Sequence, residues 1–341
     1  MGPVLAAVFC FDAPLAGQVA MPGIVIVTFN SADVIDPCLE ACVRVPGAEV
    51  VVVDNASADD TVARVRAWSG VRLIANETNR GFAGGVNQGV AKLSTEAVLV
   101  LNPDATPVQG IDAMEHVVTE EPDVGAATGR LLGSDGADQQ GFHVRSLPTP
   151  ATLVFEVLGL NRIFPGNPVN RRYRQPTPAA RQDVEQPAGA FLMLNRSLWV
   201  ELGGFDEGFF PIWFEDVDYC RRLHDRGYRI VFLPEAVARH QGGHSAGKLS
   251  WRERQVVWYG SLLRYASKHF SGASTAAVCA AVVLGSFPRA VTAIRHIGFA
   301  EAVSVLFQVV CLTGRCLRTG DRGRSTPAVI TPAEEQIKQS R

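Results

Sequence analysis

The sequence lacks the paired cysteines that would indicate a zinc site or a disulfide framework. Its seven cysteines are scattered along the chain, odd in number and without a CxxC pair. Zinc sites and redox motifs usually place two cysteines a few residues apart, whereas small secreted scaffolds carry an even number. Reduced thiols in a cytoplasmic setting are therefore expected for Cys10, Cys38, Cys42, Cys220, Cys279, Cys311 and Cys316.

Further absences exclude other classes of protein. No GxGxxG motif follows the first predicted strand, which argues against a dinucleotide-binding oxidoreductase. No basic triphosphate-binding loop follows that strand either, which argues against a nucleotidyltransferase. The first twenty residues lack the basic start of a signal peptide, and Asp12 and Pro14 interrupt their apolar stretch. Residues 1–20 are therefore expected to be a non-structural extension before Met21.

Charge is unevenly distributed along the 341 residues. Residues 246–324 carry 11 Lys or Arg against 3 Asp or Glu, a net charge of +8. Because the whole chain carries −2 and the last 17 residues are neutral, residues 1–245 carry −10. An acidic region of this size repels a phosphate backbone, so nucleic acid is not an expected partner. The basic region suits an anionic lipid surface instead.

The order of apolar runs predicts an α/β fold. Hydrophobic residues make up 47% of the chain and charged residues 19%, which is typical of a folded protein with a large core. Short apolar runs alternate with helical stretches, as in a parallel sheet that is covered by helices on both faces. The predicted strands are 24–29, 50–54, 71–75 and 97–101; the predicted helices end near 43, cover 57–68 and cover 83–93. Ligands of such sheets bind at the carboxyl ends of the strands.

The pattern changes after the fourth strand. Residues 133–187 are rich in Pro, Gln and Arg, and we interpret them as a loop-rich insertion with one helical piece near 151–160. Regular structure then returns, and the sheet domain is expected to cover residues 21–245. Residues 320–341 are predicted to be a disordered tail.

Residues 246–319 are predicted to form a basic and apolar helical extension, beginning with an amphipathic helix over 251–270. The apolar runs 276–287 and 299–312 are shorter than the roughly 20 residues that span a bilayer, and Pro288 is expected to stop the first run. We interpret both runs as helices that lie in the membrane interface. The alternative is a helical cap that packs on the sheet domain.

Acidic and aromatic side chains are mixed in the segment GGFDEGFFPIWFEDVDYCRRLHDRGY. Burial of an unpaired carboxylate is costly, so this mixture indicates a walled pocket where negative charge is needed, and therefore an enzyme. Glu215, Asp216 and Asp218 fall within one helical turn and cannot all face one way. One acid is expected to face the pocket as a base, while another caps the helix or pairs with Arg221 or Arg222.

Polar side chains follow three of the predicted strands. Asp54 ends the second strand, where an acid can hold a nucleobase or ribose, or cap the next helix. The run NRGFAGGVNQG opens a helix whose N-terminus favours phosphate, and Arg80 adds charge; an ordinary glycine-rich turn is the alternative. Asp104 follows the fourth strand and is a candidate metal ligand, with His240 as its partner and His244 as the rival.

Taken in order, these motifs resemble glycosyltransferase family 2, which has the inverting GT-A fold, and within it the rhamnosyltransferase-like branch. The motifs are TFNS (28–31), VVDNASADDT (52–61), NRGFAGGVNQG (79–89), LNPDA (101–105), GAFLMLNR (189–196), GGFDEGFFPIWFEDVDYCRRL (203–223) and HQGGHS (240–245). The resemblance implies a Rossmann-like, mostly parallel sheet flanked by helices, followed by a C-terminal helical extension that associates with the membrane.

The resemblance implies a donor site and a metal site. Asp104 and His240 match the metal ligands, for Mn²⁺ or Mg²⁺, although Asn102 stands in place of the first acid of the family's metal motif. A nucleotide-sugar donor is implied to contact Thr28, Asn30, Asp54, Asn55, Ser57, Arg80, Gly81, Asn102 and Asp104.

The resemblance also implies the reaction. Asp216 matches the catalytic base, and Glu215 supports it or binds the acceptor with Trp213 and Phe214. The base takes a proton from an acceptor hydroxyl, which attacks the anomeric carbon of the donor and inverts it. The implied sugar is L-rhamnose from dTDP-L-rhamnose, and the implied acceptor is a cell-wall or surface glycan, linked to polyprenyl diphosphate.

Alternatives remain at this level. Another sugar, such as galactofuranose, mannose or glucose, is the nearest one. A non-catalytic glycan-binding scaffold on the same fold is another, but it predicts loss of Asp104 or Asp216, and both are present. The implied location is the cytoplasm, peripheral on the inner face of the plasma membrane. The sequence carries no signal for the oligomeric state.

Overall fold

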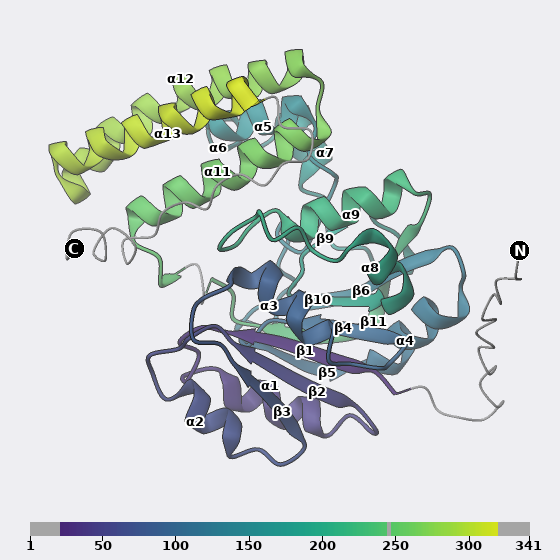
Figure 1. Ribbon diagram of the computed structural model, residues 1–341. Coiled ribbons are helices and arrows are strands. Elements are labelled where there is room, and N and C mark those ends of the chain that lie inside the picture. The colour runs from purple at the N-terminus through teal and green to yellow at the C-terminus, as the bar shows by residue number, and fades with distance from the viewer. Residues whose placement is uncertain (1–20, 244–246, 320–341) are drawn as a thin grey trace, which may run out of the picture.

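Four parallel strands form the N-terminal half of the central sheet. A computed structural model describes residues 21–243 and 247–319 (Figure 1). The strands β1 (Gly23–Thr28), β2 (Glu49–Asp54), β3 (Val71–Ala75) and β4 (Ala97–Leu101) lie in the order β3-β2-β1-β4. Thr28 pairs with Asp54, so the carboxyl ends of β1 and β2 meet at one edge. The predicted strands agree with these bounds to within about one residue, because strands buried on both faces read as continuous apolar runs.

The second half of the sheet is mixed. Strand β10 lies antiparallel between β4 and β6, and β11 lies parallel to β6 and antiparallel to β5. These strands are β5 (Ala105–Gln109), β6 (Val124–Leu132), β10 (Phe191–Asn195) and β11 (Arg229–His240). Strand β11 ends beside β5, so it brings His240 opposite Ala105 and next to the loop after β4.

Helices cover both faces of the sheet. In β1, Ile24 and Ile26 face one core and Val25 and Val27 face the other, as the alternation of a strand requires. The first core contains α1 (Ile35–Val43) and α4 (Ile111–Glu120); the second contains α3 (Gly81–Val90), α8 (Arg196–Leu202) and α9 (Glu215–Asp225). A short helix, α2 (Thr61–Arg66), lies beside α1 and β3. The predicted α/β architecture is confirmed.

The prediction of a loop-rich segment over 133–187 with a helical piece near 151–160 is confirmed, the piece being α5, but the expectation of a single helical piece is wrong. This segment holds α5 (Pro150–Val157), α6 (Leu160–Ile163), α7 (Pro168–Tyr173) and the short strands β7 (Val144–Arg145), β8 (Gln182–Asp183) and β9 (Gln186–Pro187). Thr149 and Asn167 accept hydrogen bonds from the first turns of α5 and α7, and a proline follows each of them. These are ordinary helix starts, which a search for hydrophobic period alone overlooks.

Three long helices follow the sheet: α11 (Trp251–His269), α12 (Gly272–Ile297) and α13 (Phe299–Thr319). Figure 1 shows α12 and α13 side by side above α11. The prediction that Pro288 stops a helix is wrong, because α12 continues through it. Packing against α5 and α13 offsets the backbone hydrogen bond that proline cannot donate.

One side of the extension packs on the rest of the protein, as the alternative of a helical cap predicts, whereas contact with a membrane stays a prediction. Tyr259 and Leu262 of α11 and Val282 of α12 share a core with Val157 of α5, so one side of the extension packs on the rest of the protein. The other side exposes large apolar residues, namely Leu284, Phe287, Val291, Phe299, Val303, Phe307 and Leu317.

As folded, α12 and residues 299–318 of α13 are long and apolar enough to cross a membrane, by length and composition only. The expectation that both segments are too short is therefore wrong. Core helices of soluble proteins pass the same test, so it is weak evidence of a membrane span.

The packing of α12 on α5 predicts a stability effect at Gly285. A Cβ atom at this position would lie 2.1 Å from the Val157 carbonyl oxygen, which is backbone and cannot rotate away. We expect Gly285→Val to lower the free energy of unfolding by about 1–3 kcal/mol and the melting temperature by several degrees. Gly260→Ala is the matched control, because nothing lies within 4 Å of a Cβ atom there. Equal melting temperatures for the two variants would contradict this packing.

Candidate functional site

The loops after β1 and β2 are locked together by Asp54. Its Oδ1 accepts hydrogen bonds from Thr28 Oγ1 at 2.8 Å and Ser57 Oγ at 2.5 Å, and its Oδ2 accepts one from Ser57 N at 2.9 Å. The Asn30 backbone donates to Ser57 Oγ at 2.7 Å, and the Asn30 side chain accepts from Ala58 N. Asp54 is 1% exposed. Four predicted donor residues thus form one connected cluster at the sheet edge.

The glycine-rich turn before α3 is held by Asn55. Asn55 Nδ2 donates to the Gly81 carbonyl at 2.9 Å, and its Oδ1 accepts from Asn76 Nδ2 at 3.1 Å. Gly81 has φ +75°, and a Cβ atom there would lie 2.9 Å from the Phe210 ring, so glycine is required. The Arg80 guanidinium is half-exposed and lies 3.9 Å from Glu207. As folded, the Asn55 amide therefore holds the backbone of the turn.

A cavity of about 480 Å³ opens between the sheet edge, the insertion, α9 and α11. The predicted residues Asn102, Asp104, Trp213, Phe214, Glu215, Asp216 and His240 all line it. The other predicted donor residues do not line it; they are Thr28, Asn30, Asp54, Asn55, Ser57, Arg80 and Gly81. The structure thus brings the predicted metal, base and acceptor residues to one cavity and leaves the sheet-edge cluster outside its wall.

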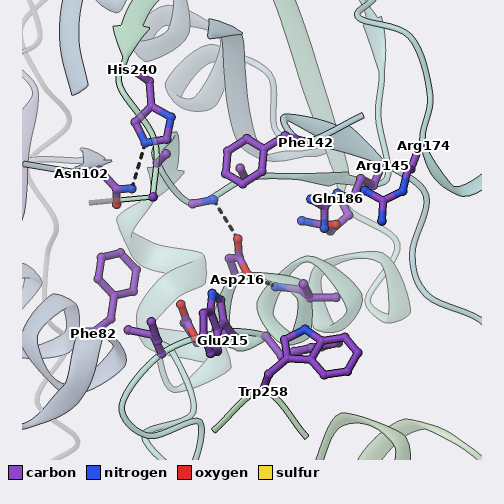
Figure 2. Close-up of a pocket in the computed structure, with 18 of the residues that line it drawn as sticks. Phe82, Asn102, Phe142, Arg145, Arg174, Gln186, Glu215, Asp216, His240 and Trp258 are labelled. Atoms are coloured by element: carbon purple, nitrogen blue, oxygen red, sulfur yellow. Dashed lines mark hydrogen bonds between the residues drawn. The ribbon is translucent and has the colours of Figure 1, made fainter. Parts of the chain in front are cut away.

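Asp104 and His240 face each other in this cavity. His240 Nε2 lies 3.4 Å from Asp104 Oδ1 and 3.4 Å from Asn102 Nδ2 (Figure 2). Both residues are buried, at 7% and 3% exposure. Gly242 N donates to Asp104 Oδ2 at 3.1 Å, which fixes the carboxylate. The rival His244 lies outside the described residues.

Gln139 orients the His240 ring. Its Oε1 lies 2.9 Å from His240 Nδ1, and its Nε2 donates to the His240 carbonyl at 2.8 Å. Because Gln139 accepts from Nδ1–H, the lone pair of Nε2 points toward Asp104 and Asn102, as in a metal-ligating imidazole. Phe142 stacks on the same ring with 5.9 Å between centroids.

A carboxylate oxygen and an imidazole nitrogen so close together fit a divalent cation such as Mn²⁺. No group of three His, Cys, Asp or Glu side chains that could hold a metal lies within 21–243 and 247–319. Among the described residues Asp104 and His240 alone are too few for a closed metal site, so further ligands must come from outside the described residues, from the substrate or from water.

Asp216 lies at the start of α9 with both carboxylate oxygens bonded to backbone. Its Oδ2 accepts from Gly189 N at 2.8 Å, and its Oδ1 accepts from Val217 N at 2.8 Å (Figure 2). Burial raises the pKa of Asp216, and the two hydrogen bonds and the charge of Arg145 offset only part of that rise. A carboxylate with a raised pKa is a better general base than an exposed one.

Glu215 is held differently from its neighbour. Its Oε2 is buried without a hydrogen-bond partner among the described residues. Burial and the adjacent charge of Asp216 raise the pKa of Glu215 well above its usual range. Burial and the adjacent charge therefore favour the protonated form of Glu215 more strongly than that of Asp216, whose ionised form accepts two backbone hydrogen bonds.

Asp218 faces away from the cavity and is fully buried. Its carboxylate contacts Arg222 at 2.9 Å, Lys268 at 2.7 Å and His269 at 2.7 Å. Burial would raise the pKa of Asp218, but the His269 hydrogen bond and the charges of Arg222 and Lys268 lower it to about 2. The prediction that one acid of this turn pairs with Arg221 or Arg222 is confirmed by this contact. Because Lys268 and His269 belong to α11, their contacts with Asp218 also hold that helix against α9.

Sequence reasoning missed one whole wall of the cavity. The missed residues belong to the insertion and to α11; they are Phe142, Arg145, Leu153, Glu156, Tyr173, Arg174, Gln186 and Trp258. Figure 2 shows Arg145, Arg174 and Gln186 together on the side of Asp216 that faces away from His240. The available signal was the close spacing of arginine and aromatic residues, Phe142 with Arg145 and Tyr173 with Arg174, within a segment of otherwise weak pattern.

Comparison with known proteins gives one consistent family. The family model described as "Glycosyl transferase family 2" matches residues 23–167. The chain is 31% identical over 213 residues to the N-acetylglucosaminyl-diphospho-decaprenol L-rhamnosyltransferase of Mycobacterium tuberculosis, covering 58% of this chain and 68% of the relative. It is 28% identical over 196 residues to the low-salt glycan biosynthesis hexosyltransferase Agl10 of Haloferax volcanii, covering 55% and 57%.

Two solved structures share the fold. GalNAc-T7 with UDP, GalNAc and Mn²⁺ matches with a TM-score of 0.50 and 16% identity, over 74% of this chain and 51% of that chain. S. aureus TarS 1-349 in complex with UDP-GlcNAc matches with a TM-score of 0.50 and 15% identity, over 94% and 92%. At such identities the likeness concerns the fold alone.

The buried charge of Asp218 predicts a pH-dependent loss of stability in Asp218→Asn. The variant leaves Arg222 and His269 without a carboxylate and removes one of the two that contact Lys268, so we expect about 3–5 kcal/mol lower free energy of unfolding at pH 7. The wild-type pKa is lowered from 3.8 to about 2, so its stabilising effect is complete above about pH 5 and is lost as pH falls toward 2. Urea unfolding at pH 2 to 7 measures the difference.

The control for this series is Asp225→Asn, which removes an exposed carboxylate from the same helix and its contact with Arg221. We expect the free energy of unfolding to change by only about 0.3–0.5 kcal/mol when this i,i+4 surface pair is removed. A difference between wild type and Asp218→Asn that stays constant from pH 7 to pH 2 would contradict the role of the ionised carboxylate.

Proposed function

The chain belongs to glycosyltransferase family 2, and we propose that it transfers L-rhamnose from dTDP-L-rhamnose to a hydroxyl of a polyprenyl-diphosphate-linked glycan. It is a glycosyltransferase by its family model and relatives. The choice of sugar and acceptor is supported by the mycobacterial relative, whose name specifies L-rhamnose and a diphospho-decaprenol acceptor. Galactofuranose, mannose and glucose are the alternative sugars.

The observation that carries the mechanism is the environment of Asp216. Its carboxylate lies in the cavity wall, is fixed by two backbone N–H groups and has a raised pKa. In our proposal Asp216 accepts the proton of the acceptor hydroxyl while the hydroxyl oxygen attacks the anomeric carbon. The bond from that carbon to the nucleotide diphosphate breaks, the diphosphate leaves with the electron pair, and the anomeric centre inverts.

We propose that Asp104 and His240 hold a divalent metal, Mn²⁺ or Mg²⁺, together with diphosphate oxygens of the donor. Bound there, the metal would neutralise the charge of the leaving diphosphate. Asn102 and Gln139 position the imidazole, as their contacts with its two ring nitrogens support. The remaining donor contacts are proposed at the sheet edge, through Thr28, Asn30, Asp54, Asn55, Ser57, Arg80 and Gly81.

We propose that the acceptor sugar lies between Asp216 and the aromatic side chains before α9. Trp213 and Phe214 line the cavity and have φ of +80° and +72°, a conformation uncommon for large side chains. In its protonated form, which burial favours, the carboxyl of Glu215 can donate a hydrogen bond to a sugar oxygen.

The extension is proposed to dock the enzyme on the cytoplasmic face of the membrane, where a polyprenyl-linked acceptor lies. The exposed apolar residues of α12 and α13 and the net positive charge of residues 246–324 support this location. We accordingly propose a transferase domain over 21–245 and a membrane-docking extension over 246–319.

Donor turnover tests the reaction directly. Full-length protein is incubated with dTDP-, UDP- and GDP-sugars and Mn²⁺, and release of the nucleotide diphosphate is followed. We expect one donor to be turned over, and Asp216→Asn to lose about 10²- to 10⁴-fold in kcat while donor binding is unchanged. Asp225→Asn, on the exposed face of the same helix, is expected to retain wild-type kcat. Turnover that survives in Asp216→Asn would remove the base from the proposal.

The metal contacts predict a separate effect of Gln139. Replacement of Gln139 by Leu removes the hydrogen bond that orients His240, so we expect Mn²⁺ affinity to fall about 10- to 100-fold. Binding is measured by electron paramagnetic resonance with the nucleotide diphosphate present, which needs no turnover. Gln140→Leu changes the neighbouring glutamine, which contacts Thr177, and is the control. Unchanged Mn²⁺ affinity in Gln139→Leu would contradict the assignment of His240 as a ligand.

A further inference from the structure

Arg145 is a cation in the cavity wall without a carboxylate partner. Its Nε donates to the Gly141 carbonyl at 3.0 Å, and no Asp or Glu side chain of the described residues lies within 4 Å of the guanidinium. The guanidinium lies 5.5 Å from the centre of the Phe142 ring and 5.7 Å from that of Tyr173. Stacking on rings and one carbonyl bond fix its position, and its charge forms no ion pair with the described residues.

Arg174 lies beside Arg145 on the same supports. Its Nη1 donates to the Gly141 carbonyl at 3.4 Å, and its guanidinium lies 5.7 Å from the Tyr173 ring. Its other nitrogens contact Glu156 at 3.0 Å and Asn170 at 3.2 Å. Arg145 and Arg174 therefore both contact the Gly141 carbonyl and the Tyr173 ring. Only Arg174 has a carboxylate partner, Glu156, so the cluster carries a net positive charge.

A second, independent feature of this wall is Gln186. It is 3% exposed, and its Nε2 donates to the Pro187 carbonyl at 3.0 Å. Its Oε1 is buried and has no hydrogen-bond partner among the described residues, although Gln186 lines the cavity. A buried amide oxygen without a partner is costly, and a ligand hydroxyl would satisfy it. The wall thus offers an anion site and an acceptor for a polar ligand next to each other.

The cluster lies on the acceptor side of the base. In Figure 2 Arg145, Arg174 and Gln186 lie on one side of the Phe142 ring and Asn102 and His240 lie on the other, with Asp216 below the ring. Arg145 acts on Asp216 through its charge but makes no ion pair with it, so space remains between the two. A donor diphosphate at the metal site would lie on the opposite side, which leaves the cluster for an anion on the acceptor.

The cavity wall is joined to the extension. Arg289 of α12 donates to the Glu156 carbonyl at 3.1 Å and to Tyr259 Oη at 2.7 Å, and Glu156 lines the cavity. The same helix exposes the apolar side chains of Leu284 and Phe287, at 64% and 51%.

We propose that Arg145, with Arg174 beside it, forms a subsite for the diphosphate of a polyprenyl-linked acceptor. The proposal rests on the transfer reaction above, in which the sugar that is attacked carries its diphosphate on the anomeric carbon. The diphosphate then lies one sugar ring from the hydroxyl that Asp216 deprotonates. Guanidinium groups pair with phosphate oxygens through two parallel hydrogen bonds, which orients the sugar as well as binding it.

Two acceptors that differ only in the diphosphate test the subsite. Full-length wild type, Arg145→Gln, Arg145→Lys and Arg171→Gln are assayed with prenyl-diphospho-N-acetylglucosamine and with octyl N-acetylglucosaminide. Arg171 is an exposed arginine of α7 outside the cavity wall and serves as the control. We expect Arg145→Gln to raise KM for the diphosphate acceptor about 10- to 100-fold and to leave KM for the octyl glycoside and for the donor unchanged. Arg145→Lys is expected to recover part of the loss.

Two other results overturn the subsite. An equal loss of kcat/KM with both acceptors in Arg145→Gln means that Arg145 acts through Asp216 and binds no diphosphate. A raised KM for the donor means that Arg145 contacts the donor diphosphate. Melting temperatures of all variants show whether each is folded.

A binding arm separates this proposal from the proposed function. Binding of farnesyl diphosphate and of farnesol is measured in EDTA, which removes the metal that a donor-side diphosphate needs. Farnesyl diphosphate is expected to bind wild type and Arg171→Gln more tightly than Arg145→Gln, and farnesol to bind all three alike. If no sugar is transferred to either acceptor, the proposed function fails, while weaker binding in Arg145→Gln still supports the anion subsite. Equal binding of farnesyl diphosphate to wild type and Arg145→Gln overturns it.

Discussion

The arrangement of the cavity depends on the carboxylate of Asp218, which does not line the cavity itself. Asp218 is fully buried on α9 and stays ionised because Arg222, Lys268 and His269 surround it. Lys268 also contacts Asp206 at 2.9 Å, as does Arg264 at 2.8 Å. These contacts fix α11 against α9 and against the loop before it. Since a helical turn has fixed geometry, fixing Asp218 outward directs Asp216 toward the cavity.

Opposite charges are separated across the cavity. Asp104 and His240 lie on one side and Arg145 lies on the other, with the Phe142 ring between them and Asp216 below it. Burial favours the protonated form of Glu215, which limits the negative charge beside Asp216. With a divalent metal at Asp104 and His240, as proposed above, a substrate with two anionic groups, one at each end of the reacting sugars, would match this distribution. Low local polarity strengthens each of these interactions relative to water.

The parallel strands and the residues at their ends could be predicted from the sequence, because burial on both faces produces unbroken apolar runs. It could also be predicted that Asp216 and Asp218 face different surroundings, since three acids in one helical turn cannot share a face. The insertion was predicted only in part: α5 was expected near 151–160, whereas α6 and α7 were missed, because both are short and α7 is marked by its cap rather than by hydrophobic period. The position of Arg145 near Asp216 could not be predicted either. It depends on the pairing of β7 with β9, which joins residues more than forty positions apart in the chain. The continuation of α12 through Pro288 likewise depends on packing partners elsewhere in the chain.

One short stretch of the insertion serves both ends of the cavity. Gln139 orients His240, Phe142 stacks on the same imidazole, and Arg145 lies three residues further on. A loop of this kind cannot be exchanged in parts. Under the proposed roles of His240 and Arg145, a change of acceptor through replacement of residues 139–145 would also remove the support of the metal ligand. Acceptor preference and metal geometry would then change together, through replacement of the whole loop rather than through single substitutions.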